Sequence, residues 1–70
     1  MKRQNYSISN DYILMNEDGK NDILKHISFL TDQDIMPASS LHWGWILYFD
    51  WMNESELKIL SKFIDYIFYA

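Results

Sequence analysis

The chain has 70 residues, of which 49% are hydrophobic and 17% aromatic, it contains no cysteine, and its formal net charge is −4. This length allows one domain, residues 1–70. The lack of cysteine excludes disulfides, thiolate metal ligands and a cysteine nucleophile. The negative charge disfavours direct binding to nucleic acid. The longest apolar run, residues 43–49, is shorter than the ~18 residues that a membrane span requires, and the polar N-terminus is unlike a secretory signal, so we expect a cytoplasmic protein without membrane contact.

The N-terminal segment predicts two short strands after a frayed end at residues 1–5. YSIS and YILM, which begin at Tyr6 and Tyr12, flank Asn10 and Asp11, a pair suited to a tight hairpin turn. The alternative is a short helix, capped by Ser9 or Asn10, that runs from Tyr12 to Glu17. We favour the strands.

A short helix is predicted next. Gly19 marks a turn before it, and Asn21 and Asp22 are suitable N-caps. Its apolar side consists of Ile23, Leu24, Ile27 and Leu30.

The following segment, residues 31–40, is predicted to be a polar loop interrupted by Pro37. A loop of this length in so small a domain either serves a function or only connects two elements, and connection is the simpler interpretation. Asp32 and Asp34 give the loop two carboxylates that suit a basic partner.

Residues 41–51 show the period-two alternation of a long strand. Six apolar residues point one way: Leu41, Trp43, Trp45, Leu47, Phe49 and Trp51. The opposite side is mixed and consists of His42, Gly44, Ile46, Tyr48 and Asp50. One apolar and one mixed side is typical of a half-buried strand, and aromatic residues favour strands.

The C-terminal part predicts an amphipathic helix from Glu54 to Tyr69. Asn53 and Glu56 have the spacing of a capping box. Apolar residues recur at helical spacing at Leu57, Leu60, Phe63, Ile64, Ile67 and Phe68. The elements together predict a two-layer α+β domain in which both helices cover one face of the sheet. If the first and the long strand run parallel, their crossover should be right-handed.

No catalytic or metal-binding pattern stands out, and we expect neither an enzyme nor a cofactor. The acidic residues show no spacing that makes two carboxylates converge on a cleft. His26 and His42 are too few for a zinc site without distant carboxylates, and Asp32-Gln33-Asp34 lacks the rest of a calcium loop. Ser39 and Ser40 precede His42, but spacing alone does not make a catalytic triad.

These observations favour a binding protein that acts on another macromolecule. We expect the mixed side of the long strand to remain uncovered and to bind a protein partner with a basic surface. The predicted contact residues are His42, Ile46, Tyr48 and Asp50, together with Asp32 and Asp34. The function class we favour is a small acidic inhibitor, immunity or anti-defence protein of phage or plasmid type. The alternative is a homo-oligomeric structural or assembly accessory protein.

Overall fold

The computed structural model describes residues 3–69, which form a two-layer α+β domain. A 3-10 helix, η1 (Arg3–Asn5), precedes the strands β1 (Tyr6–Ile8) and β2 (Tyr12–Met15), and the helix α1 (Glu17–His26) follows them. Two further strands, β3 (Met36–Pro37) and β4 (Trp45–Tyr48), precede the C-terminal helix α2 (Glu54–Tyr69). The predicted fold class is therefore confirmed.

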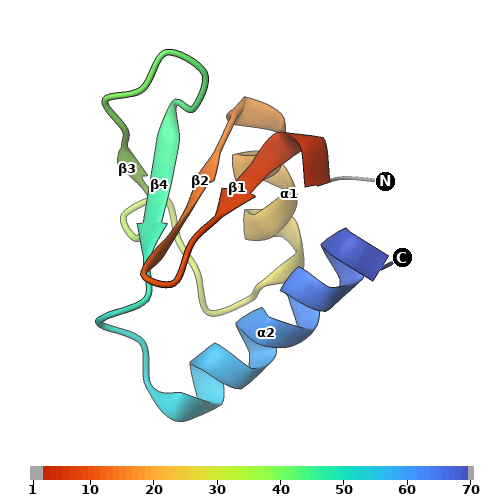
Figure 1. Ribbon diagram of the computed structural model, residues 1–70. Helices are drawn as coiled ribbons and strands as arrows, with labels where there is room; N and C mark the ends of the chain where they lie inside the picture. The colour runs from red at the N-terminus through yellow and green to blue at the C-terminus, as the bar shows by residue number, and fades with distance from the viewer. Residues whose placement is uncertain (1–2, 70) are drawn as a thin grey trace.

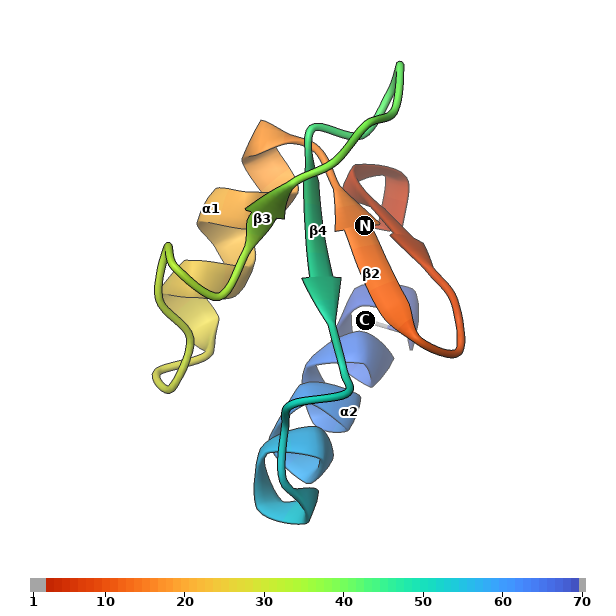
Figure 2. The ribbon, with the colours of Figure 1, turned by 90° about the vertical axis from the view of Figure 1, so that its left-hand side faces the viewer.

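The four strands form one antiparallel sheet in the order β1-β2-β4-β3 (Figure 1). β1 and β4 are each antiparallel to β2, which lies between them, so the first strand and the predicted long strand do run in the same direction. The chain passes through β2 before it reaches β4, so no single strand–helix–strand crossover joins β1 to β4. Figure 2 looks at the sheet with both helices behind it, so one face of the sheet is covered and the other is open. The two helices thus cover the same face, as predicted.

The hairpin predicted at the N-terminus is present. The Ser9 N–H donates to the Tyr12 carbonyl across the turn at 2.9 Å, and the Ser9 hydroxyl accepts from the Asp11 and Tyr12 N–H groups. Of the frayed end predicted at residues 1–5, residues 1 and 2 lie outside the described residues. Residues 3–5 instead form η1, because Asn5 accepts two hydrogen bonds from Asn16, one through its backbone carbonyl and one through its side chain.

The first helix begins earlier than predicted. Asn16, not Asn21 or Asp22, is the N-cap, and its side chain accepts a hydrogen bond from the Gly19 N–H at 2.9 Å. Gly19 was wrongly predicted to be in a turn: it lies in the first turn of α1, buried against β1 and η1. A Cβ there would lie 2.6 Å from the Asn5 carbonyl oxygen, so this position requires glycine for close approach of the backbone.

The predicted polar loop at residues 31–40 contains two features that the sequence did not reveal. A turn at residues 31–34 sends Ile35 into the core, where it is 2% exposed. Met36 and Pro37 then form β3, and Pro37 is tolerated because β3 is an edge strand.

The predicted long strand at residues 41–51 is wrong in its length, since only Trp45–Tyr48 are in β4. Its partner β2 is four residues long and ends at Met15, which pairs with Trp45, because Asn16 then caps α1. The residues before Trp45 therefore have no partner in β2. Within this region Trp45, Leu47 and Phe49 pack inward as predicted. Leu41 and Trp51, also predicted to point inward, are 98% and 46% exposed.

The C-terminal helix has the predicted bounds and the predicted capping box. The Asn53 N–H donates to the Glu56 carboxylate at 3.0 Å, and the Glu56 N–H donates to the Asn53 side-chain oxygen at 2.9 Å. Leu57 is 37% exposed, whereas the rest of the predicted apolar stripe packs into or against the core. One hydrophobic cluster joins the sheet to both helices.

Candidate functional site

The open face of the sheet carries large apolar and aromatic side chains. The registers Tyr12↔Tyr48 and Leu14↔Ile46 place these four residues on the same face, because directly paired residues share a face. Ile13, Leu47 and Met15 alternate with them and are fully buried on the covered face. We call Tyr12, Leu14, Ile46 and Tyr48 the open-face residues.

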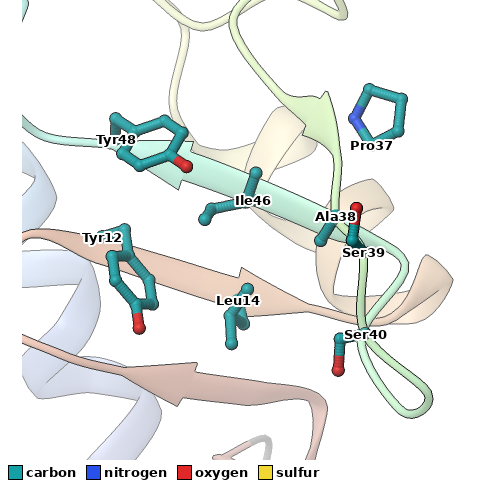
Figure 3. A pocket seen from close by; sticks show the side chains of 8 residues that line it. All are labelled: Tyr12, Leu14, Pro37, Ala38, Ser39, Ser40, Ile46 and Tyr48. Carbon is teal, nitrogen blue, oxygen red and sulfur yellow. The ribbon is translucent and has the colours of Figure 1, made fainter.

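A hollow of about 390 Å³ lies over the open-face residues. Figure 3 shows Tyr12 and Tyr48 at one end, and Leu14 and Ile46 between them and the opposite wall. Pro37, Ala38, Ser39 and Ser40 form that wall. The hollow thus has an apolar floor, an aromatic end and a rim that includes hydroxyl groups.

Pro37 of the wall belongs to β3, and the other three residues belong to the loop of residues 38–44, which joins β3 to β4. Its two ends are held together by a hydrogen bond of 3.0 Å from the Ala38 N–H to the Gly44 carbonyl. The loop projects beyond the end of the sheet (Figure 2). Leu41 lies in this loop and is 98% exposed, which gives the loop an apolar side chain that contributes nothing to the core.

The structure brings together only some of the predicted contact residues. Ile46 and Tyr48 lie on the open face and line the hollow. His42 is exposed in the projecting loop, where its N–H donates to the Ser40 hydroxyl at 3.4 Å, and it does not line the hollow. Asp50 is exposed in the turn after β4 and likewise does not line the hollow. Both residues lie outside β4 because that strand is shorter than predicted.

Asp32 and Asp34 are not part of the hollow either. The Asp34 carboxylate accepts hydrogen bonds from the Thr31 N–H at 2.8 Å and from the Thr31 hydroxyl at 3.3 Å, so it holds the turn at residues 31–34. The Asp32 carboxylate lies 3.7 Å from the Lys20 ammonium group of α1. The structure therefore gives Asp34 a local structural role and directs Asp32 towards α1.

The sequence did not single out the contribution of β2 to the site. Tyr12 and Leu14 form half of the open-face residues. The sequence YILM does indicate an apolar open face, because a strand that is apolar at every position has apolar residues on both of its faces. Such a strand shows no alternation of apolar and polar residues, so neither of its faces stands out as a binding surface.

The charge of the sheet and its loops has one sign. Segments 4–16 and 27–53, which contain all four strands, include no lysine or arginine but include Asp11, Asp32, Asp34 and Asp50. Asp11 and Asp50 lie at the tyrosine end of the hollow: the Asp11 carbonyl accepts a hydrogen bond from the Phe49 N–H at 3.0 Å, and Asp50 is the next residue. Lys20, Lys25, Lys58 and Lys62 are all on the two helices.

A second groove, also of about 390 Å³, lies between the two helices. It is lined by His26, Ile27, Ile59, Lys62, Phe63 and Tyr66. The His26 ring contacts Phe63 with a centroid separation of 5.7 Å, and its Nδ1 lies 2.8 Å from the Asp22 carbonyl oxygen. The ring contact joins α1 to α2, and the Asp22 contact within α1 holds the His26 ring in place, so the residues that line this groove have a structural role.

Tyr6 connects β1 to α1. Its hydroxyl lies 3.1 Å from the Gly19 carbonyl oxygen and 3.0 Å from an Asp22 carboxylate oxygen, so its proton is shared between two acceptors. Burial, and then the Asp22 carboxylate, raise the pKa of the Tyr6 phenol far above its ordinary value. The Tyr6 ring also makes an edge contact with Phe63 of α2, with centroids 6.0 Å apart. Tyr6 is therefore part of the scaffold.

Within residues 3–69, no helix has the length and apolar character needed to cross a bilayer. In that same part of the chain, no three histidine, aspartate or glutamate side chains come close enough together to hold a metal ion. Comparison with protein-family models, with curated proteins and with solved structures finds no match to this chain.

Proposed function

We propose that this is a non-enzymatic cytoplasmic protein that binds another protein through the open face of its sheet. The mode of action we propose is that of a small acidic inhibitor, immunity or anti-defence protein, of the phage or plasmid type, that blocks its target. The observation that supports this proposal is the apolar and aromatic character of the open face.

The free face of an antiparallel sheet in a two-layer domain usually carries polar side chains, because it is in contact with water. Here every residue of β2 and β4 on that face is apolar or aromatic: Tyr12, Leu14, Ile46 and Tyr48. Met36 of β3 pairs with Ile46, extends the same row and is 44% exposed. A contiguous apolar surface of this kind is more typical of an interaction site than of a surface that only contacts solvent.

Charge favours a different protein over a second copy as the occupant. Two copies packed face to face would join two sheet surfaces of the same negative sign, with no lysine or arginine in segments 4–16 and 27–53 to balance Asp11 and Asp50. A partner with a basic rim around an apolar centre would complement the open face, and the opposite charges would also speed the encounter.

The proposal is tested by capture from a lysate of the native host at low and high salt, with two variants matched in chemistry. Tyr48→Glu places a charge in the open face, whereas Tyr69→Glu makes the same change at an 85% exposed position near the end of α2. We expect the unmodified protein and Tyr69→Glu to capture the same partner, more weakly at high salt, and Tyr48→Glu to capture none.

Two outcomes would contradict the proposal. Capture that survives Tyr48→Glu would place the binding surface elsewhere. Sedimentation of the pure protein as a stable oligomer that Tyr48→Glu dissociates would show that the open face is an interface between copies, as in the alternative of an assembly accessory protein.

A further inference from the structure

We propose that the hollow on the open face binds the side chain of an arginine presented by the protein partner. This inference rests on the proposed function and names the chemistry of the contact. It follows from three properties of the hollow: its aromatic end, its apolar floor and the sign of the charge around it.

The aromatic end suits a planar cation. The Tyr12 and Tyr48 rings have centroids 6.0 Å apart and an interplanar angle of 68°, so the two rings form a corner. A cation placed over an aromatic ring within about 6 Å of its centroid is attracted by the negative charge of the ring face. A guanidinium group in this corner would meet the face of one ring and lie beside the other.

The floor and the wall suit the rest of the side chain. Leu14 and Ile46 form an apolar surface between the tyrosines and the loop wall, against which the methylene groups of arginine can pack. Tyr12 and Tyr48 line the end of the hollow where the guanidinium would lie, and a phenol oxygen can accept a hydrogen bond from a guanidinium N–H group. Ser39 and Ser40 lie on the opposite wall, near where the backbone end of the arginine would lie. Arginine donates five such bonds in a fixed plane and is less strongly hydrated than lysine, so it fits this mixed surface better.

The charge near the hollow favours a cation. Asp11 and Asp50 lie at its tyrosine end, and the segments that build it contain no lysine or arginine. On the covered side of the sheet the protein already uses such a contact internally, since the Lys20 ammonium group lies 3.6 Å from the centroid of the Trp45 ring. On the open face, the tyrosine rings, with Asp11 and Asp50 in the adjacent turns, would be complemented by a cation from the partner.

The inference is tested by titrating the isotope-labelled protein with N-acetyl-arginine methylamide and with the citrulline analogue, which has nearly the same shape but no charge. We expect saturable amide shifts of Tyr12, Leu14, Ile46 and Tyr48 with arginine, and affinity for citrulline at least tenfold weaker. Replacing both tyrosines, in Tyr12→Leu/Tyr48→Leu, should abolish the shifts. Tyr69→Leu should leave them unchanged.

Equal affinity for arginine and citrulline, or shifts that map to the α1–α2 groove, would overturn the inference. These results are distinguishable from failure of the proposed function. If Tyr48→Glu abolishes partner capture while arginine produces no shifts at the open face, the docking surface stands and the arginine contact is wrong. If capture survives Tyr48→Glu, the docking surface itself is wrong.

Discussion

Tyr12 and Tyr48 contact each other edge to face across the β2–β4 ladder, on the side of the sheet opposite to both helices. Tyr48 is 38% exposed, whereas its neighbour Leu47, which points to the other side, is fully buried. Two adjacent residues of one strand therefore belong to different parts of the molecule, one to the open face and one to the core.

This difference predicts that substitutions at the two positions lower stability by different amounts. Tyr48→Glu should lower the free energy of unfolding by at most about 1 kcal/mol, the scale of a cross-strand contact and of strand propensity. Leu47→Ala should lower it by about 2–5 kcal/mol, because it removes a buried side chain and leaves a cavity. Urea denaturation followed by circular dichroism measures both changes. Equal destabilisation by the two substitutions would show that Tyr48 is part of the core.

Gly19 and Gly44 provide a matched pair of substitutions. Alanine at position 19 would place its Cβ 2.6 Å from the Asn5 carbonyl oxygen and 3.1 Å from the Met15 Cβ. We expect Gly19→Ala to destabilise the fold by about 1–3 kcal/mol through overpacking, although alanine is the better helix former by about 1 kcal/mol. Gly44→Ala meets nothing within 4 Å, so its effect should be close to zero. Thermal unfolding of the two variants tests this, and stabilisation by Gly19→Ala would contradict the close approach of η1 to α1.

The hydroxyl of Tyr6 should stabilise the fold at neutral pH. Tyr6→Phe removes the donor to Gly19 and Asp22 but keeps the ring against Phe63, so we expect a loss of about 1–2 kcal/mol. Denaturation at pH 7 measures this loss. No change would mean that the two hydrogen bonds do not contribute.

The same residue predicts a loss of stability at high pH. In the unfolded chain the Tyr6 phenol releases its proton near pH 10, whereas its raised pKa keeps it protonated in the folded protein. Above pH 10 the unfolded state therefore binds fewer protons than the folded state. The contribution of Tyr6 is complete below pH 10 and falls by about 1.4 kcal/mol per pH unit above it. The free energy of unfolding of Tyr6→Phe, measured from pH 8 to pH 11, should fall less steeply than that of the unmodified protein, and parallel curves would contradict this account.

The parts of the fold that could be predicted from the sequence are those fixed by local signals. The capping box of Asn53 and Glu56 defined the start of α2, and the spacing of apolar residues such as Leu60, Phe63 and Ile67 defined its buried side. The hairpin was also predicted, because Asn10 and Asp11 interrupt two apolar strands of suitable length.

The errors have a common cause, which is contact between segments distant in the sequence. Gly19 was predicted to be a turn residue because its contact with Asn5, which explains the need for glycine, is not visible in the sequence. The alternation of residues 41–51 continues beyond the ladder, but β2 provides partners only for Trp45–Tyr48. Ile35 and β3 were missed because their partners in the sheet and core lie elsewhere in the chain.

In the candidate site, too, residues fixed by a local pattern were predicted and residues fixed by distant contacts were not. Ile46 and Tyr48 follow from the alternation within one strand, and both lie on the open face. Tyr12 and Leu14 depend on the pairing of β2 with β4, which no local pattern specifies. Asp32 and Asp34 were chosen for charge alone, and the structure uses one in a turn and places the other beside Lys20.

The most direct test of the open-face proposal is photocrosslinking from single positions in cells of the native host. Benzoylphenylalanine at position 48 lies on the open face, and at position 61 it lies on an exposed part of α2. We predict one specific adduct with a protein partner from position 48, suppressed by an excess of the unmodified protein, and none from position 61. An adduct with the same partner from position 61 but not from position 48 would show that the partner binds the helical side, and would contradict the account.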